Sequence, residues 1–238
     1  MPLILRRTLE YSYDRYNQIP KADPTLVLHF NTQIPNDEKD TILYDYSIYG
    51  NNGQIYGAQW TPEGLKVDGV DDYVEVGHSN VLNLPDAFTL ICWGKIVDTS
   101  PEQWIISKRG TLNPNSGYFL GVGGNHILSG YYQSGVGWKI KSGGVSLGNN
   151  IWRFYTSTWD GATLRLYVDG QTDLTLATGG SVETNTEPLN IGRCSADSYR
   201  VYGLIGEVRI YSRALSADEI LALYNKTKSL YLYRRGYL

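Results

Sequence analysis

The sequence predicts an all-β protein, and three observations support this class. Short segments rich in aliphatic, β-branched and aromatic residues recur from about Thr25 onward, as in "TLVLHF", "FTLICWGKI" and "WRFYTSTWD". Turn sequences such as "DGVDD", "NPNSG" and "VDGQT" separate these segments. The 238 residues include 26 glycines and 20 tyrosines, which suits short strands joined by tight turns. Many short strands at this spacing are typical of a sandwich or a barrel.

One segment shows the alternation of a strand with one buried face. In "WDGATLRLYVDGQ", Leu164, Leu166 and Val168 fall on one side of an extended chain, and Arg165 and Tyr167 fall on the other. Asp-Gly pairs bound the segment at both ends, as they do in hairpins. We therefore expect the core to form between sheet faces.

A single helix is predicted near the C-terminus, in "SADEILALYNK". Ser216 is a suitable N-cap, and Glu219 stands three residues later, where it completes a capping box. Ile220, Leu223 and Tyr224 form an apolar stripe. We expect this short helix to close one end of the sandwich.

Charge and composition exclude several classes of function. The net charge of −3 provides no overall field for a polyanion, and the body shows no basic patch, so nucleic-acid binding is not expected. The N-terminus has too short an apolar run for a signal peptide, and no later stretch has the length of a membrane span. Cys92 and Cys194 could form one disulfide, but Cys92 lies in a strand-like segment and suits a small buried hydrophobe better.

Several motifs resemble the laminin-G-like family. They are "DYSIYGNNGQIYG" (residues 45–57), "VDGVDDYVEVGHSNVLNL" (67–84), "FTLICWGKI" (88–96), "WRFYTSTWDGATLRLYVDGQ" (152–171), "LNIGR" (189–193) and "LIGEVRIYSRALSADEILALY" (204–224). The resemblance implies a concanavalin A-like jelly roll of two antiparallel sheets over residues 23–225, with an N-terminal arm (1–22) and a C-terminal tail (226–238). It does not settle function, because the same scaffold serves lectins, glycosidases, adhesins and virion parts.

No catalytic residue is expected. Glycosidases on this scaffold need two carboxylates close together, commonly from a Glu-x-Asp-x-x-Glu strand, and that pattern is absent from the sequence. The pairs Asp71-Asp72 and Asp218-Glu219 have structural explanations, in a family turn and at a helix N-terminus. No Gly-x-Ser-x-Gly motif occurs either. A glycan-degrading enzyme is therefore the least favoured function.

The resemblance implies one structural Ca²⁺. The family commonly holds this ion between an Asp-x-Ser-x-x-Gly-Asn loop and the acidic start of the penultimate strand. The corresponding residues here are Asp45, Gly50, Asn52 and Glu207, with Gly206 where the family often has a further acid. The alternative is an Asx-turn at Asp45 with Glu207 facing solvent.

Sugar binding is a second possibility, because aromatic rings stack on pyranose faces and polar groups contact the hydroxyls. The stretches "GNHILSGYYQSGVGW" and "GRCSADSYRVYG" supply the candidates His126, Tyr132, Trp138, Arg193 and Tyr199. Adjacent residues of a strand face opposite sides, so we expect one of Tyr131 and Tyr132 in the core and the other on the surface, with Tyr132 as the candidate for sugar binding.

The two ends of the chain favour contact between subunits. Residues 1–21 hold four cations and two acids, residues 226–238 hold four cations and no acid, and the body between them is acidic. The tail offers Tyr231, Tyr233, Arg234, Arg235 and Tyr237, residue types enriched at interface hot spots. The alternative is that both arms fold back on their own domain as edge strands.

The sequence therefore favours a non-catalytic structural subunit of a larger assembly, such as a virion or an extracellular surface structure. Its expected partners are copies of itself or other subunits, with a cell-surface glycan as an attachment partner. The alternative is a carbohydrate-binding module without an assembly role. A structural Ca²⁺ is the one cofactor expected.

Overall fold

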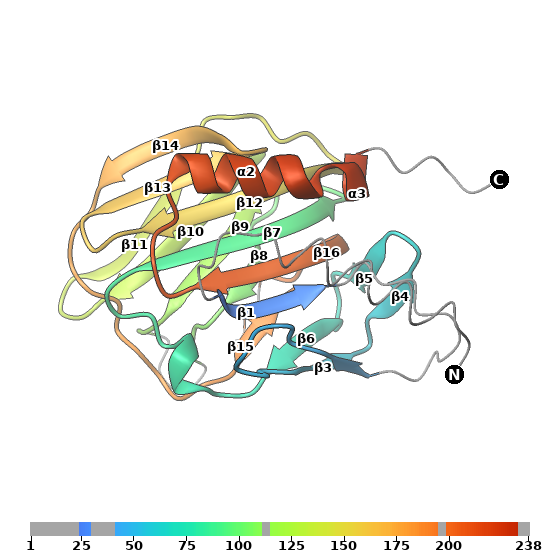
Figure 1. Ribbon diagram of the computed structural model, residues 1–238, viewed down its shortest axis with the longest axis horizontal. Helices are drawn as coiled ribbons and strands as arrows, with labels where there is room; N and C mark the ends of the chain where they lie inside the picture. Colours follow the sequence, from blue (N-terminus) through green and yellow to red (C-terminus); the bar gives the residue numbers. More distant parts are fainter. Residues whose placement is uncertain (1–23, 30–40, 111–114, 195–198, 233–238) are drawn as a thin grey trace.

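The protein is a sandwich of two antiparallel sheets, and one helix lies across the outside of one sheet (Figure 1). The computed structural model describes residues 24–29, 41–110, 115–194 and 199–232. This architecture confirms the all-β jelly-roll prediction.

Sheet A has its longest strands, β12, β7 and β16, next to one another in the middle. Its spatial order is β14 (Gln171–Ala177), β13 (Thr163–Val168), β12 (Ile151–Trp159), β7 (Phe88–Ile96), β16 (Tyr202–Tyr211), β5 (Gly64–Asp68) and β4 (Gln59–Thr61), while β1 (Pro24–His29) also pairs with β16. The first half of β16 pairs with β5 and the second half with β1. The register shift between Ile205 and Glu207 separates the two halves.

Sheet B packs against sheet A. Its order is β11 (Gly137–Ser142), β10 (His126–Gln133), β9 (Tyr118–Gly123), β8 (Gln103–Ser107), β15 (Leu189–Ile191), β6 (Tyr73–Val76), β3 (Gly53–Tyr56) and β2 (Ile42–Leu43). A short 3-10 helix, η1 (Asn80–Leu82), follows β6. Nonadjacent strands such as β8 and β15 are neighbours in space, so segments far apart in the sequence meet on this sheet.

The main core lies between the two sheets. Leu164, Leu166 and Val168 of β13 are buried in it, as their alternation predicts. Tyr131 of β10 is fully buried in the same core, and Tyr132 points out of it. Cys92 also lies in this core as a free cysteine, so the expected role of a small buried hydrophobe is confirmed.

The predicted helix forms but does not close an end of the sandwich. Helix α2 (Ala217–Thr227) begins after Ser216, whose hydroxyl accepts a hydrogen bond from the Glu219 backbone N–H, and both halves of the capping box are present. The helix lies along the outer face of sheet A (Figure 1). Ile220 and Leu223 bury themselves there in a second cluster, together with large side chains of β7, β12, β13 and β16. The outer face of these strands carries large apolar side chains such as Trp93 and Phe154, so this part of the face needs a cover.

Tyr231 packs on its own domain, although the sequence favoured its contact with a neighbouring subunit. Tyr231 lies in α3 (Ser229–Leu232) and is only 5% exposed, packed on its own domain. Its ring stacks on Trp93 with the centroids 4.5 Å apart and lies 5.0 Å from Trp152. The two indoles lie on the outer face of β7 and β12, and Tyr231 of α3 covers them. The other tail candidates, Tyr233, Arg234, Arg235 and Tyr237, lie outside the described residues.

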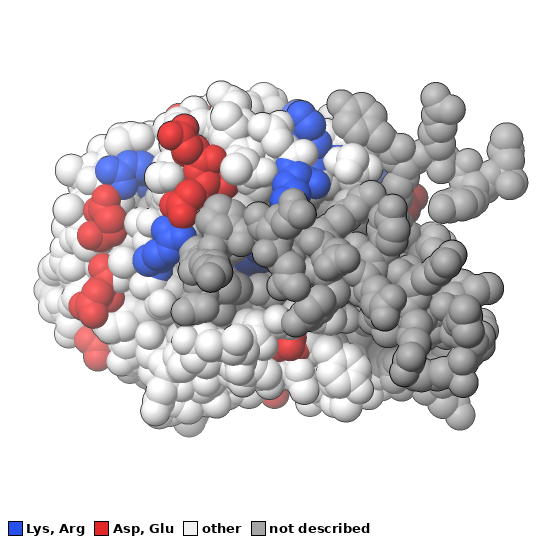
Figure 2. Space-filling view, viewed as in Figure 1, with Lys and Arg blue, Asp and Glu red and all other residues white. Residues whose placement is uncertain are grey.

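The face of the molecule that carries α2 displays both basic and acidic side chains (Figure 2). Several are paired, as Arg213 is with Glu219 and Arg165 with Asp160. Among the described residues, no helix has the length and apolar character needed to cross a membrane.

Candidate functional site

An aromatic patch covers part of the outer face of sheet B. It consists of Trp104 on β8, Phe119 on β9, Tyr132 on β10, Trp138 on β11 and Tyr199, which follows β15. Strand residues reach this face at every second position, because their neighbours point into the core. Four strands and a loop therefore build the patch together.

Three rings of the patch form a continuous stack. The Tyr199 ring lies parallel to Trp104 with centroids 4.9 Å apart and an interplanar angle of 9°. Trp104 in turn lies 3.8 Å from Phe119 at 3°. Phe119 is fully buried and Trp104 is 2% exposed, whereas Tyr199 is 36% exposed. Tyr199 is thus the ring of the stack that solvent reaches.

The backbone of Tyr199 is held in a conformation that tyrosine rarely adopts. Its φ is 57°, in the left-handed region. The Tyr199 carbonyl accepts a hydrogen bond of 2.8 Å from the Trp104 backbone N–H, so this conformation places the ring over the indole. Such a backbone costs roughly 1–3 kcal/mol, and strained residues of this kind cluster at binding sites.

Trp138 and Tyr132 extend the patch at the edge of the sheet. They are directly opposite in the β10–β11 register, and their rings meet edge to face at 5.8 Å. Trp138 also lies 5.8 Å from Trp104 and 5.9 Å from Phe119. Both are partly exposed. Gly130 pairs with Phe119 across the strands and leaves room for its ring, since a Cβ there would overlap it.

Arg109 brings a positive charge to the patch. Its guanidinium carbon lies 5.6 Å from the Trp104 ring centroid and 5.7 Å from that of Trp138. At these distances the cation is attracted to the negative ring faces. The Nη1 of Arg109 also lies 4.0 Å from the Sγ of Cys194, a free and buried cysteine. Arg109 can therefore offer hydrogen-bond donors beside two indoles.

The structure does not bring Arg193 into the patch. Its guanidinium lies 3.3 Å from the Tyr73 ring centroid, and its Nε donates to Asn190 Oδ1 at 2.9 Å. Glu75 lies 3.6 Å from the same guanidinium. Tyr56 stacks on Tyr73 at 4.6 Å. Arg193 thus belongs to a separate polar and aromatic cluster on β3, β6 and β15.

His126 is also separate from the patch. It lies six residues before Tyr132 on β10, on the same face but about 20 Å away at the rise of a strand. Its Nδ1 lies 3.0 Å from the Val145 carbonyl oxygen. Three patch residues, Trp104, Phe119 and Arg109, were missed by the sequence analysis. The only signal was the position of Trp104 in a strand-like segment, which does not tell a core indole from an outer one.

The loop after β2 uses the predicted metal ligands for its own hydrogen bonds. The Asp45 carboxylate accepts from the backbone N–H groups of Val27, Ser47 and Asn51 and from the Ser47 hydroxyl. Asn52 Oδ1 accepts from the Asp45 N–H at 2.9 Å. The Gly50 carbonyl, in a residue with φ of 63°, accepts from the Asn52 N–H. The Asx-turn proposed as the alternative is therefore present.

Glu207 is placed differently from both sequence interpretations. It is fully buried, not solvent-facing, and its Oε1 accepts a hydrogen bond from the Nε of Arg209. Strand β1 lies between it and the loop, because His29 pairs with Glu207 while Leu28 bridges to Asp45. The Asp45 carboxylate and Glu207 Oε1 already accept hydrogen bonds, and strand β1 separates the two residues, so the donor set does not fit a Ca²⁺ site.

Comparison with solved structures identifies the fold. The binding domain of Paraclostridial Mosquitocidal Protein 1 superposes with a TM-score of 0.66 at 15% identity, covering 85% of this chain and 52% of that one. The botulinum neurotoxin serotype G binding domain gives 0.66 at 17% identity, covering 87% and 51%. The serotype D ligand-binding domain, solved in complex with N-acetylneuraminic acid, gives 0.65 at 20% identity, covering 85% and 50%. This chain spans about half the length of these neighbours.

Sequence comparison identifies the family. No curated protein matches the sequence. The Laminin_G_3 family model, described as the concanavalin A-like lectin/glucanases superfamily, matches residues 68–221. That segment contains β6 to β16, the start of α2 and the whole aromatic patch. Because the matched segment is more than half of the chain and the fold agrees, this protein belongs to the concanavalin A-like lectin/glucanases superfamily.

Proposed function

We propose that this protein binds a glycan at the aromatic patch. The observation that carries the proposal is the stack of Tyr199, Trp104 and Phe119, whose outermost ring is held over Trp104 by a strained backbone. A pyranose offers an apolar face to such rings, and the preformed stack reduces the ordering cost of binding.

The exposed rings and Arg109 have different roles in this proposal. Tyr199 and Trp138 offer faces for stacking, and the Tyr132 ring meets Trp138 edge to face at its side. Arg109 supplies donors for sugar hydroxyls or a carboxylate. Sialylated glycans are the first ligands to test, since one structural neighbour was solved with N-acetylneuraminic acid.

A glycan array followed by calorimetry tests the proposal. We expect a defined set of glycans to bind, and Trp138→Ala and Tyr199→Ala each to weaken binding by about tenfold while the fold is kept. The matched control is Tyr56→Ala, which removes an exposed tyrosine from β3. Equal loss in the control and the patch variants would place the contact elsewhere, and an array without any bound glycan would refute the proposal.

A second function, assembly into a larger particle, is supported by a different surface. The loop around Asp45 exposes a run of large apolar and aromatic side chains: Ile42 at 43%, Tyr44 at 55%, Tyr46 at 48%, Ile48 at 80% and Tyr49 at 42%. Asp45 is the only charged residue between Ile42 and Tyr49, and its carboxylate is turned into the loop. A preorganised apolar loop suits contact with another copy of the chain.

Native mass measurement tests this second function. We expect an oligomer that Ile48→Ser shifts toward the monomer, while Val136→Ser, which changes another exposed apolar residue, leaves it unchanged. A virion or an extracellular surface is the location that we propose, because glycans are displayed where such particles attach. A monomer at all concentrations in the parent chain would remove the assembly function.

A further inference from the structure

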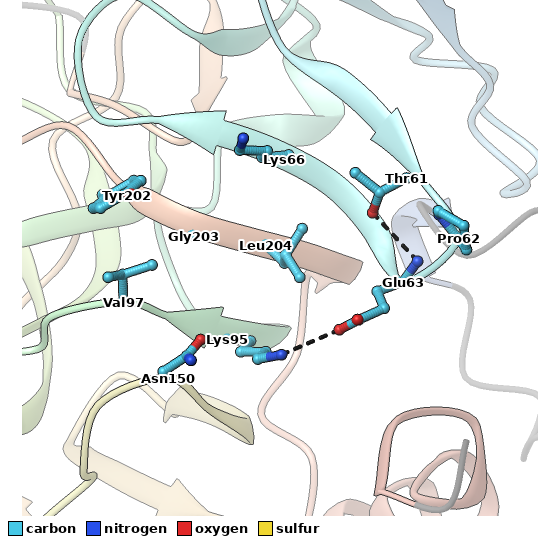
Figure 3. A pocket seen from close by; sticks show the side chains of 10 residues that line it. All are labelled: Thr61, Pro62, Glu63, Lys66, Lys95, Val97, Asn150, Tyr202, Gly203 and Leu204. Carbon is cyan, nitrogen blue, oxygen red and sulfur yellow. Dashed lines mark hydrogen bonds and ion pairs between the residues drawn. The ribbon is translucent and has the colours of Figure 1, made fainter. Parts of the chain in front are cut away.

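A pocket opens on the outer face of sheet A, on the opposite sheet from the aromatic patch (Figure 3). Its lining comes from the β4–β5 hairpin, from the start of β16, from the end of β7 and from the residue before β12. The cavity volume is about 340 Å³. This is near the lower end of the range for small-molecule sites, so the pocket suits a small ligand.

The strand register places two lysines on either side of a leucine. Leu204 pairs with Lys66 on β5 and with Lys95 on β7, so the three side chains stand in one row on the same face. Adjacent strands are about 5 Å apart, which separates the two lysine Cα atoms by about 10 Å. The apolar side chain of Leu204 therefore has a lysine on each side (Figure 3).

The charges of the pocket do not cancel. Glu63 pairs with Lys95 at 3.2 Å, with their side chains 49% and 24% exposed. Exposed pairs of this kind hold together weakly. Lys66 forms no ion pair with any residue in the described parts of the chain. The residues that line the hollow therefore carry an excess of one positive charge, and Asp72, a further acid that interacts with Lys66, is not part of the lining.

The rest of the lining is suited to a polyhydroxylated ring. Tyr202 is 48% exposed and presents its ring at the rim, and Val97 adds apolar surface beside Leu204. Asn150 contributes a side-chain amide that makes no hydrogen bond to the residues described in the structure. Thr61 accepts from the Glu63 N–H and donates to the Gly64 carbonyl, which fixes the hairpin turn that forms one wall.

We propose that this pocket binds a small acidic saccharide. Lys66 and Lys95 pair with its carboxylate or sulfate, the ring rests on Leu204 and Tyr202, and Asn150 contacts a hydroxyl. Glu63 competes with the ligand for Lys95. The site is independent of the aromatic patch, so either can fail without the other.

An NMR titration with matched sugars tests the proposal on the full chain. Glucuronic acid should shift the backbone amide signals of Leu204 and Asn150 and bind about tenfold more tightly than glucose. Lys66→Gln should abolish that preference, while Lys139→Gln, a change of equal charge on sheet B, should keep it. Glu63→Gln should tighten glucuronic acid binding several-fold, which a purely structural role of this residue would not produce.

Other outcomes would overturn the proposal. Equal shifts with acetate would indicate an adventitious anion only, and equal binding of glucose and glucuronic acid would remove the role of charge. Tighter binding of the dipeptide Asp-Glu than of glucuronic acid would indicate an acidic peptide partner. Shifts confined to the amides of Tyr132 and Trp138 would assign the acidic sugar to the aromatic patch.

Discussion

The ring of Tyr231 occupies the space that a side chain at Gly206 would need. A Cβ at this glycine would overlap the tyrosine ring and would also approach Trp152. In the laminin-G-like resemblance, an acid often stands at this position next to Glu207, and this chain has glycine there. The C-terminal segment of this chain therefore takes up the volume in which the family commonly has a metal ligand.

The Gly206–Tyr231 contact predicts a coupled loss of stability. Gly206→Ala should lower the free energy of unfolding by about 2 kcal/mol, because the added methyl displaces the ring from Trp93. In a Tyr231→Ala background the same change should cost little, since the ring is gone. Urea denaturation of the single and double variants measures the coupling. Additive effects would mean that the ring does not press on the glycine.

Removal of the segment after Lys228 should destabilise the domain. Tyr231 is 5% exposed, so its loss leaves a cavity over the indoles and should cost about 3 kcal/mol. Tyr231→Ala alone should show most of this effect, whereas Leu232→Ala, at 39% exposure, should change stability by less than about 0.5 kcal/mol. A truncated chain that keeps its stability but loses oligomers would restore the intersubunit interpretation of the tail.

Calcium should leave the melting temperature unchanged. A ligand that binds only the folded state raises its stability by mass action. Because the Asp45 carboxylate already accepts four hydrogen bonds and Glu207 pairs with Arg209, we expect no such increment from millimolar Ca²⁺. Thermal melts with calcium and with chelator measure this. An increment that Glu207→Gln abolishes would support the metal that the resemblance implies.

The buried Lys108 should make stability depend on alkaline pH. It is 1% exposed and its Nζ donates to the Glu187 carbonyl at 2.7 Å. Burial lowers its pKa from 10.5 to about 8, against the attraction of Glu187. Between these values the unfolded chain binds more protons than the folded one, so the free energy of unfolding rises with pH.

Urea denaturation at about pH 7.5 and about pH 9.5 measures the Lys108 effect. The parent chain should gain stability relative to Lys108→Met over this interval, because only the parent loses the cost of a buried ammonium. Parallel changes in the two proteins would assign the pH dependence to other groups.

Hydrolysis of glycans is not expected. In the described region Glu75 pairs with Arg193, and Glu102 accepts a hydrogen bond from the Trp104 indole, so both of these carboxylates already have partners. Incubation with β-glucans, alginate and sialosides should release no reducing sugar. Turnover that disappears with one Asp or Glu substitution would show that the protein is an enzyme.

Local patterns in the sequence were enough to predict which strand residues face the core and where the helix begins. The alternation of Leu164, Leu166 and Val168 follows from strand geometry alone. The capping box of Ser216 and Glu219 involves groups only three residues apart. The same alternation predicted that Tyr131 and Tyr132 face opposite sides, whereas the pairing of Tyr132 with Trp138 across the β10–β11 hairpin is seen only in the structure.

The tertiary structure decided where α2 lies, which residues form the aromatic patch, and that Tyr231 contacts Trp93. Trp93 donates to Thr227, 134 residues later, and Tyr199 stacks on Trp104 through a loop and a strand that meet only in the folded chain. Local propensity contains no information on such pairings, because they depend on which strands become neighbours and which apolar face is left to be covered. The sequence by itself determined that Trp93 and Trp104 lie in strands and that Tyr224 lies in a helix. The packing of the sheets decided which of them became core and which became a surface that can bind.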